Sequence, residues 1–375
     1  MPLTHLEIQN FRLLKKVVIE PGAKLNVITG WNAAGKTTLL EATHVLATGR
    51  SFRTKRWSEL IRHGADSLMV HGIVVEGDQE HRVGLAFDGR GRTIRVDGSA
   101  MKGAAVLARH VPLLAITPEL HFEFLRSSRH RRGLLDWWLF HVEPDFYPKW
   151  LRYQRLLGQR NAALRCSSPP AVQFLWDEDL AALGEDLDHS RQNFFRQLRE
   201  EFLQTAGTLL QRGAVSLHFL RGWEDNEPLL ALLQRTRASD QRRGFTQSGP
   251  HLADLRLDLD MDGIRTQLSH GQQKLLVIAL RLAQLRLFMA KTGRRCVLLA
   301  DDIGAELDRI HRQRVCDVLE ALETQIFLTA MEARDFAPRS RAHSMFHVEQ
   351  SCINSVSSSS STSKKSDLPD VEMLK

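Results

Sequence analysis

The chain has 375 residues, 43% of them hydrophobic and 25% charged, which is typical of an ordinary soluble globular protein with two or three domains. No run of 18 apolar residues occurs and the N-terminus lacks a leader's apolar core, so we expect no membrane association. The net charge of +7 favours polyanionic partners, although a solvated basic surface would also produce it. The four cysteines form no CxxC pair, which argues against a zinc site or disulfides and suits a cytoplasmic protein.

The first part of the chain has β-strand patterns around one helix. Alternating apolar and polar residues predict a hairpin from residues 3–8 and 14–19. A short apolar run at 25–28 predicts a buried strand, and helical spacing predicts a helix at 36–47. Three β-like runs separated by Gly and Asp predict an antiparallel meander at 68–97.

The middle of the chain, about residues 119–245, has the pattern of long arginine-rich helices, and β-like alternation returns afterwards. The serine-rich C-terminus has too few apolar groups to fold, so we expect a disordered tail. The elements expected here are a helical segment at 171–210 after a break at 166–170, a strand at 252–263, a helix at 271–290, a strand at 296–300 and a tail at 351–375.

The sharpest signal is the sequence GWNAAGKT, which matches GxxxxGK[ST] and lies between the predicted 25–28 strand and the 36–47 helix. Backbone N–H groups of such a loop face phosphate, and the helix N-terminus adds positive potential. We expect Lys36 to neutralise the β- and γ-phosphates and Thr37 to place its hydroxyl on Mg²⁺. The residues of this segment expected to bind ATP are Gly30, Asn32, Gly35, Lys36, Thr37 and Thr38.

A second signal is the apolar run at 296–300, which ends in Asp301 and Asp302. A buried strand that ends in two acids is typical of a Walker B motif, in which Asp301 holds the Mg²⁺ shell. Asp302 would then lie where a base polarises the attacking water, so it is the expected catalytic residue. Acidic strand ends are also common at ordinary helix N-caps, but the upstream P-loop favours the nucleotide site.

The third signal, LSHGQQK at 268–274, opens the predicted 271–290 helix with Ser269 as a plausible N-cap. It is similar to the LSxGQ signature of the ABC ATPase superfamily, whereas an ordinary capped helix would not explain Gly271 and Gln272. The resemblance implies that Ser269, Gly271 and Gln272 contact an ATP held by a second copy in a head-to-tail dimer. The segment GAELD at 304–308 resembles the D-loop at that seam.

Among these ATPases, the chain resembles the RecF family most. Rad50 and SMC proteins carry hundreds of heptad residues between P-loop and signature, which this chain lacks. Transporter ATPase subunits usually have a shorter insert there and lack the opening hairpin. The similar segments are LEIQNFR (6–12), LEA (40–42), GRSFRT (49–54), GPH (249–251), LSHGQQK (268–274), the acids at 301–302 with ELD (306–308), and MFHVE (345–349).

The resemblance implies an α/β fold: an ABC-type P-loop ATPase head, with a mixed sheet and an antiparallel β subdomain, and an inserted α-helical arm. We expect ATPase lobes at 1–118 and 246–350 around an arm at 119–245. The resemblance implies ATP and Mg²⁺ as cofactors, an ATP-dependent homodimer, and sequence-independent binding of duplex DNA or a single-strand/double-strand junction, released by slow, weakly DNA-stimulated hydrolysis. It also implies roles in recombinational DNA repair and replication, recombinase loading and SOS induction, with RecR and RecO as partners.

Five positions depart from the family's pattern. Ala33 stands where the family usually has glycine, and a positive φ there would cost alanine about 1 kcal/mol and weaken nucleotide binding. Ala305 removes a D-loop hydroxyl, and Leu252 replaces the arginine expected after Gly-Pro-His. Thr329 stands for the sensor histidine of transporter ATPases, and Asp302 is one methylene shorter than the usual glutamate. The last two are in keeping with slow turnover, as in a switch.

Three basic clusters are candidate DNA surfaces, because several arginines on one face give salt-dependent phosphate binding. A solvated charged surface is the alternative for each cluster. The favoured cluster, just after the P-loop helix, consists of Arg50, Arg53, Lys55 and Arg56. The others are Arg126, Arg129, Arg131 and Arg132, whose composition also suits a salt-bridge network, and Arg235, Arg237, Arg242 and Arg243.

Several other features have ordinary structural interpretations or leave other functions open. Glu119 lies near the Q-loop position but is better interpreted as a helix N-terminal acid, and the aromatic residues at 137–150 are better interpreted as core. A nucleotide-regulated scaffold with negligible ATPase and no DNA role is the alternative function, supported by Ala33 and Asp302. A transporter-energising subunit is a third possibility, against which the helical arm and the basic charge argue.

Overall fold

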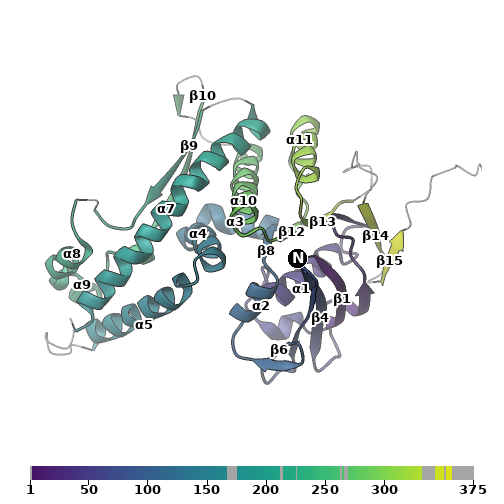
Figure 1. Cartoon of the computed structure of the whole chain (residues 1–375), viewed down its shortest axis with the longest axis horizontal. Helices are drawn as coiled ribbons and strands as arrows, with labels where there is room; N and C mark the ends of the chain where they lie inside the picture. The colour runs from purple at the N-terminus through teal and green to yellow at the C-terminus, as the bar shows by residue number, and fades with distance from the viewer. Residues whose placement is uncertain are drawn as a thin grey trace, which may run out of the picture.

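The N-terminal third of the chain forms a six-stranded antiparallel sheet in the order β2-β1-β4-β5-β6-β7 (Figure 1). Alternation along β1 buries Leu6 and Ile8 on one face and turns Glu7 to the other. The predicted hairpin and meander are confirmed, and β7 extends the meander by one strand. The strands are β1 (Leu3–Phe11), β2 (Leu14–Ile19), β4 (Leu68–Glu76), β5 (Gln79–Phe87), β6 (Arg92–Val96) and β7 (Ser99–Met101).

A second sheet has the order β15-β14-β3-β13-β12-β8, and all of its neighbouring strands are parallel except β14 and β15. The strands are β3 (Leu25–Thr29), β8 (Leu113–Ile116), β12 (Val297–Ala300), β13 (Gln325–Thr329), β14 (His343–Glu349) and β15 (Cys352–Val356). Its central strands β3, β13 and β12 are almost entirely buried because both faces of the sheet are covered. Leu299 packs in a core with α1 (Lys36–Thr48) and the antiparallel sheet, whereas its neighbour Leu298 packs with α10 (His270–Thr292).

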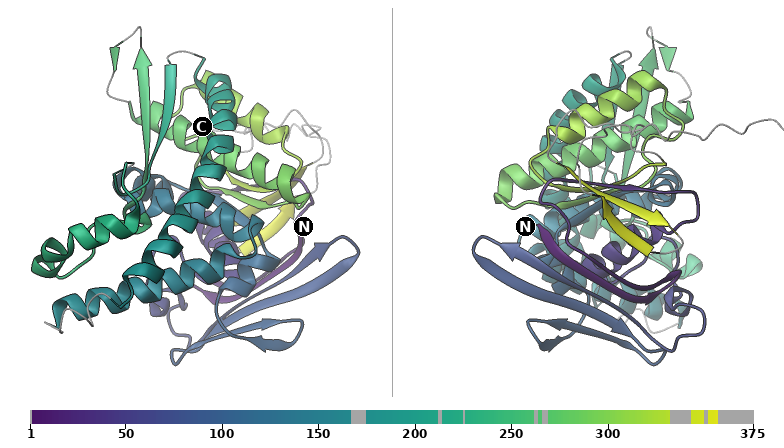
Figure 2. Two further views of the ribbon diagram at one scale, coloured as in Figure 1. Left: turned by 60° about the vertical axis from the view of Figure 1, so that its left-hand side comes forward. Right: turned by 90° about the vertical axis from the view of Figure 1, so that its right-hand side faces the viewer.

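Figure 2 shows these layers: the antiparallel sheet on one side of the central sheet, and α10 with α11 (Arg309–Glu320) on the other. Because the carboxyl ends of parallel strands meet at one edge, the segments after β3, β12 and β13 lie together there. Two short helices complete the head, α2 (Ala105–His110) and the 3-10 helix η1 (Trp57–Leu60). The structure is a computed structural model that describes residues 2–166, 175–211, 214–224, 226–261, 264–265, 269–331, 343–349 and 352–356.

The arm projects from the head, and its long helix α7 (Asp177–Leu210) runs from the arm's far end to α10 (Figures 1 and 2). The other helices are α3 (Pro118–Arg126), α4 (Ser128–Val142), α5 (Phe146–Arg165), α8 (Leu229–Arg235), α9 (Arg237–Arg243) and the 3-10 helix η2 (Pro250–Leu252). Trp138 is buried and stacks on Phe194 at 4.1 Å between ring centroids. This aromatic residue is therefore part of the core, as expected, and does not form a base-stacking surface.

Two expectations about secondary structure were wrong. Part of the helical middle is the strand β9 (Ala214–Leu220), which pairs with β10 (Asp254–Met261) in a small sheet that also contains β11 (Ile264–Arg265). The alternating residues of β9 form a strand because they pair with β10, which the sequence did predict. The predicted tail begins with β15, which gains its hydrogen bonds from β14 and packs Ile353 against the core. The remaining tail, 357–375, and the break at 167–170 lie outside the described residues.

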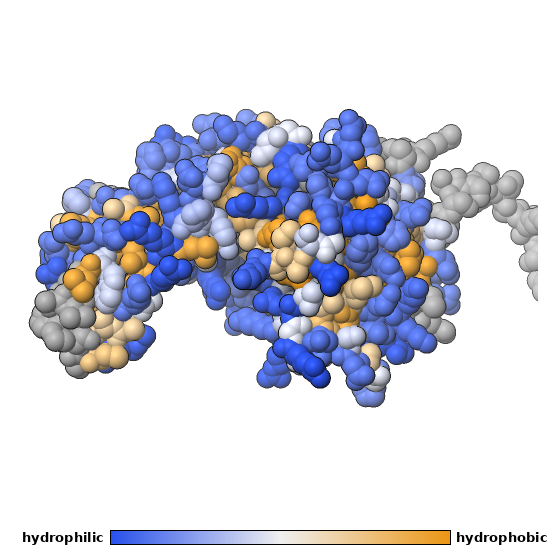
Figure 3. All heavy atoms as spheres, turned by 60° about the horizontal axis from the view of Figure 1, so that its bottom comes forward, coloured by the Kyte–Doolittle hydropathy of each residue, from blue (hydrophilic) through white to orange (hydrophobic). Residues whose placement is uncertain are grey.

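The surface seen in Figure 3 is mostly hydrophilic, and its apolar side chains form small separate groups. None of the helices in the described ranges combines the length and hydropathy that crossing a bilayer requires. The predicted α/β fold, with a mixed sheet, an antiparallel sheet and a helical arm, is confirmed.

Candidate nucleotide-binding site

The loop between β3 and α1 is shaped by three residues with positive φ angles: Gly30 (144°), Ala33 (63°) and Gly35 (120°). A Cβ atom at Gly30 would collide with the carbonyl oxygen of Val348 in β14, so glycine is required there. Ala33 occupies the left-handed region, at a cost of about 1 kcal/mol relative to glycine. Helix α1 begins directly after this loop without a side-chain cap, so its first N–H groups are available to an anion.

Lys36 lies at the start of α1 and folds back over the loop. Its Nζ atom donates hydrogen bonds to the carbonyl oxygens of Gly30 (2.6 Å) and Trp31 (3.0 Å). Burial lowers the pKa of Lys36, and the nearby carboxylates of Asp301 and Asp302 oppose that shift. The ammonium is thus held beside the loop by backbone oxygens, which a phosphate can replace.

Asp301 follows β12 and is only 5% exposed. Its Oδ1 atom accepts a hydrogen bond from the Thr329 hydroxyl at 2.7 Å, and Thr37 also donates to this carboxylate. Burial raises the pKa of Asp301, and these two hydrogen bonds oppose the shift. A buried carboxylate beside a threonine hydroxyl is an all-oxygen donor set, which fits the coordination preference of Mg²⁺.

Asp302 lines the same site with its backbone in the left-handed region, at a φ of 48°. Its backbone N–H donates to the hydroxyl of Thr329 at 2.9 Å. Thr329 therefore contacts both acids from the end of β13, the strand between β3 and β12. Its sequence position at the end of an apolar strand was the available signal, but the sequence analysis considered it only as a replaced histidine.

One cavity of about 680 Å³ brings these groups together, within the size range of small-molecule sites. The expected ATP or Mg²⁺ residues that line it are Asn32, Gly35, Lys36, Thr37, Thr38, Asp301 and Asp302. Its other lining residues include Leu13, Arg53, Glu119, Ala305, Arg312, Thr329 and Met331. Gly30 supports the loop from behind, and the three signature residues lie outside this cavity.

The signature segment forms the exposed N-terminus of α10. The hydroxyl of Ser269 accepts from the backbone N–H of Gln272, and the Gln272 side chain accepts from the N–H of Ser269 at 2.9 Å. This reciprocal capping box explains the serine and the glutamine structurally. A Cβ atom at Gly271 would lie 3.5 Å from the carbonyl oxygen of Glu306, so the glycine gives no clearance that alanine would lack. Leu268 lies outside the described residues.

The favoured basic cluster is divided between two places. Arg53 lines the nucleotide cavity, where its guanidinium lies 3.7 Å from Glu119 and 3.7 Å from Glu41. Arg50, Lys55 and Arg56 are exposed outside the cavity. All four side chains are exposed, and Arg53 differs from the other three in lining the nucleotide cavity as well.

Glu41, on α1, is a buried carboxylate to which the sequence analysis gave no role. Arg12 donates to both of its oxygens at 2.6 and 2.8 Å, and Ser51 donates to Oε1 at 2.5 Å. These bonds fix the turn after β1 and the GRSFRT segment against the P-loop helix, and Arg53 is positioned by the same carboxylate. The partners are far apart in sequence, so no local pattern reveals the cluster.

The second basic cluster is largely structural. Arg131 forms a two-bond ion pair with Asp254 at 2.6 and 2.9 Å, and Arg132 donates to the carbonyl oxygen of Ala253 at 2.6 Å. These contacts attach α4 to the start of β10. They favour the salt-bridge alternative over a DNA surface.

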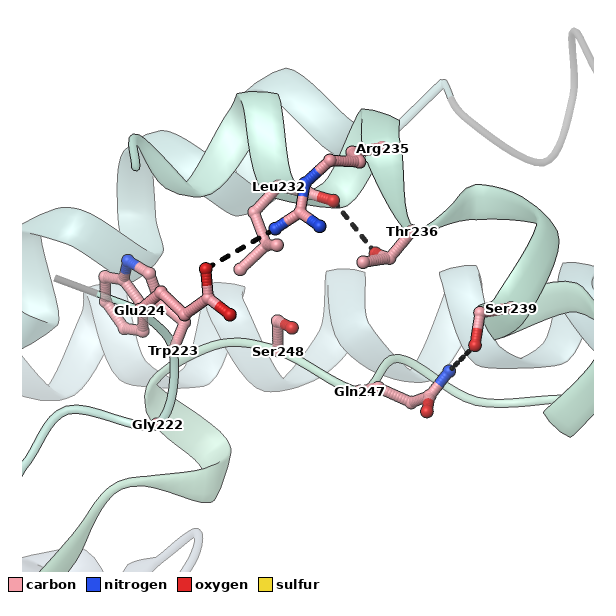
Figure 4. A pocket seen from close by; sticks show the side chains of 9 residues that line it. All are labelled: Gly222, Trp223, Glu224, Leu232, Arg235, Thr236, Ser239, Gln247 and Ser248. Atoms are coloured by element: carbon pink, nitrogen blue, oxygen red, sulfur yellow. Dashed lines mark hydrogen bonds and ion pairs between the residues drawn. The ribbon is translucent and has the colours of Figure 1, made fainter. Parts of the chain in front are cut away.

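One residue of the third cluster, Arg235, lines a cavity of about 450 Å³ in the arm (Figure 4). Arg235 forms ion pairs with Glu227 at 2.7 Å and with Glu224 at 3.6 Å. The dashed line in Figure 4 marks the pair with Glu224. Gln247 donates to the hydroxyl of Ser239 at 2.8 Å on the opposite wall. The cationic group at this cavity is thus already neutralised by two carboxylates, which disfavours phosphate binding there.

A P-loop, a strand of the same sheet that ends in two acids, and a signature helix on the same head define an ABC-type ATPase head. The chain matches the family model described as the RecF/RecN/SMC N-terminal domain over residues 2–354. The heads of Smc proteins share the fold, with a TM-score of 0.62 for an Smc head bound to the C-terminal winged-helix domain of ScpA, at 16% sequence identity.

Within that class, the similarity to RecF extends over nearly the whole chain. The RecF protein of Chromohalobacter salexigens is 41% identical over 93% of this chain and 98% of its own length, and that of Pseudomonas putida is 38% identical over 94% and 98%. A solved structure of the recombination mediator protein RecF-ATP in the RecFOR pathway has a TM-score of 0.82 at 25% identity, covering 94% of this chain and 97% of that one. The chain belongs to the RecF family.

Proposed function

We propose that the chain is an ATP-dependent DNA-binding protein of replication and recombinational repair, in which two copies close around ATP and thereby bind DNA. The observation that carries the proposal is the separation of two halves of an ATP site. The P-loop and both acids line one cavity, whereas the signature N-terminus is exposed elsewhere on the same copy. Relatives named DNA replication and repair protein RecF and a RecF-ATP structure support the role.

Within one copy, the cavity residues bind and orient ATP. Lys36 and the N-terminal N–H groups of α1 contact the phosphates, with Gly30, Asn32, Gly35 and Thr38 shaping the loop. Thr37 and Asp301 would hold Mg²⁺, which, when bound, neutralises charge on the phosphate oxygens. These residues fit that ion because the buried Asp301 carboxylate and the Thr37 hydroxyl beside it form an all-oxygen group of donors.

Asp302 is the proposed general base. Its carboxylate lines the cavity and accepts a proton from the water that attacks the γ-phosphate. Thr329 holds the backbone of Asp302, and so the short side chain is presented from a fixed turn. An aspartate reaches less far than a glutamate, so we expect slow, weakly DNA-stimulated turnover that serves to release DNA.

The second copy would complete the site with the N-terminus of its α10. Ser269 and Gly271 lie at the exposed end of that helix, where unpaired N–H groups and the helix dipole favour a phosphate. The side chain and the backbone N–H of Gln272 are both engaged in the capping box, so its contact with the partner's ATP requires these bonds to open. Two such contacts in a head-to-tail pair give an ATP-dependent homodimer.

The DNA contact is proposed to involve Arg50, Arg53, Lys55 and Arg56 near the P-loop helix, with no reading of sequence. Arg53 lines the ATP cavity and belongs to the same segment, so nucleotide occupancy and the basic segment are adjacent. Junction binding, recombinase loading, SOS induction and partnership with RecR and RecO belong to this proposal by family membership. So does the division into ATPase lobes at 1–118 and 246–350 and an arm at 119–245.

Fluorescence anisotropy of a labelled duplex tests the function directly. With ATP and Mg²⁺ the affinity should exceed that with ADP or without nucleotide at each of two salt concentrations, and Lys36→Ala should abolish the gain. The salt dependence then estimates the number of phosphate contacts. Binding that is equal in all three nucleotide states would contradict the proposal.

The alternative, a nucleotide-regulated scaffold without a DNA role, is favoured by one observation, the positive φ of Ala33. Strain in the P-loop weakens nucleotide binding and thus turnover. Phosphate release measured with and without duplex DNA distinguishes the two functions. A rate that is insensitive to both DNA and Asp302→Asn would support the scaffold.

A further inference from the structure

Three potential metal ligands meet on the antiparallel sheet: His5 and Glu7 on β1, and His71 on β4. One ligand atom from each lies within 4.8 Å of the other two. The register places Glu7 directly opposite His71, and His5 follows on the same face of β1. The two imidazole rings are 6.4 Å apart between centroids, edge to face. All three side chains are half-buried on the face of the sheet opposite its core.

The surroundings leave these groups available to a ligand. Neither imidazole has a hydrogen-bond partner among the described residues, and no ion pair within those residues joins Glu7 to either ring. Gln9 donates to Oε1 of Glu7 at 2.8 Å, which orients the carboxylate, and within the described ranges no hydrogen bond reaches Oε2. Across β5, the residue paired with His71 is Gly84, so no side chain lies directly opposite the ring, and the nearby charged group of that strand is Arg82.

We propose that His5, Glu7 and His71 bind one Zn²⁺ ion, with water in the fourth position. Two histidines and a glutamate are an established zinc donor set, with bonds of about 2.0–2.2 Å. The ligand atoms of a tetrahedral site are therefore roughly 3.4 Å apart, which side-chain rotation from the present spacing reaches. The absence of a CxxC pair argues against a zinc site built from cysteines, and the proposed site contains no cysteine. The ion would join β1 to β4 outside the nucleotide cavity.

Isothermal titration of the chelator-stripped, full-length protein with ZnCl₂ tests the site, in excess Mg²⁺ and ATP so that the nucleotide cavity is filled. One Zn²⁺ should bind per chain, and His71→Gln, His5→Gln and Glu7→Gln should each weaken binding at least tenfold. Zn²⁺ should also raise the melting temperature of the wild-type protein and not of His71→Gln. Co²⁺ bound in place of Zn²⁺ should give the visible absorption of a four-coordinate site.

The matched control is His81→Gln, which removes another histidine of this sheet, one that contacts Asp97 at 2.9 Å and lies near His110. It should bind Zn²⁺ as the wild type does. Circular dichroism of each variant in chelator separates loss of a ligand from loss of fold. Zinc binding that is absent from the wild type, or unchanged in both His5→Gln and His71→Gln, would overturn the proposal and leave the proposed ATPase function untouched.

Discussion

The Lys274 ammonium donates a hydrogen bond of 2.7 Å to the carbonyl oxygen of Ala305, and a second of 3.1 Å to that of Asp302. Lys274 belongs to the signature helix, and its two acceptors belong to the turn after β12. The lysine is 8% exposed, and burial lowers its pKa against the opposing effects of Asp302 and Glu306. The signature helix and the turn that carries the proposed base are thus tied together within one copy.

Lys274→Met should slow ATP hydrolysis at least tenfold and leave the ATP affinity within about threefold of wild type. Hydrogen bonds from a charged group stabilise the turn that carries Asp302 by about 1.5–3 kcal/mol. If that stabilisation is lost from the transition state, each 1.4 kcal/mol added to the activation barrier slows the reaction about tenfold. Single-turnover phosphate release and titration with a fluorescent ATP analogue measure the two quantities. Lys274→Arg, which keeps the charge and donors, is the control, and wild-type hydrolysis by Lys274→Met would refute the coupling.

Ala33→Gly should raise ATP affinity severalfold. The left-handed backbone at this position costs alanine about 1 kcal/mol that glycine does not incur, and the P-loop must keep that shape to bind phosphate. Equilibrium titration with a fluorescent ATP analogue gives the change. Ala34→Gly, at the neighbouring position outside the left-handed region, should give no gain. Equal or weaker binding by Ala33→Gly would show that the strain does not limit affinity.

His141→Phe should flatten the pH dependence of stability below neutral pH. Burial among Trp137, Phe140 and Phe288 lowers the pKa of His141 from 6.5 to about 3, and neither ring nitrogen has a hydrogen-bond partner among the described residues. Between those values the unfolded chain binds a proton that the folded chain does not, so stability falls as the pH is lowered. This one group contributes about 1.4 kcal/mol per pH unit.

Urea unfolding at pH 7, 6 and 5 measures that contribution as the difference in slope between His141→Phe and the wild type. The exposed residue His189 provides the control, as His189→Gln. If the unfolding free energy of His141→Phe changed with pH as steeply as that of the wild type, the His141 imidazole of the wild type would be protonated in the folded protein.

Arg160→Met should destabilise the arm by about 3–5 kcal/mol. The guanidinium is fully buried and lies 2.7 Å from Asp177 and 2.8 Å from Asp240. Its removal takes from the buried Asp240 the cation it pairs with and leaves the buried Asp177 with Arg237, at 3.4 Å. Arg152→Met, which breaks an exposed ion pair with Asp179, should cost no more than about 1 kcal/mol. Denaturant unfolding followed by circular dichroism compares them, and equal costs would contradict the burial argument.

The sequence was sufficient for the parts of the site that are contiguous in the chain. Lys36, Thr37, Asp301 and Asp302 each belong to a motif whose local pattern specifies a strand, a loop and a helix. Even the strain at Ala33 could be anticipated, because a departure from glycine raises the question of a positive φ.

Contacts between distant segments could not be predicted in the same way. The bonds from Thr329 to both acids depend on β13 lying between β3 and β12, and strand order is not readable from one sequence. Arg53 was grouped with three exposed neighbours, although Glu41 and Glu119 hold it in the cavity. The strands β9 and β15 were missed because they gain stability from a partner strand, while their own patterns are short.

The central claim is that one copy supplies the P-loop and another the signature for each ATP. Lys36→Ala inactivates the P-loop and Ser269→Arg blocks the signature, so neither variant alone should hydrolyse ATP. An equal mixture forms mixed dimers with one intact composite site, and ATP hydrolysis should return to about a quarter of the wild-type rate. A mixture that stays inactive, while Ser269→Arg still binds ATP and both variants are folded, would contradict the claim.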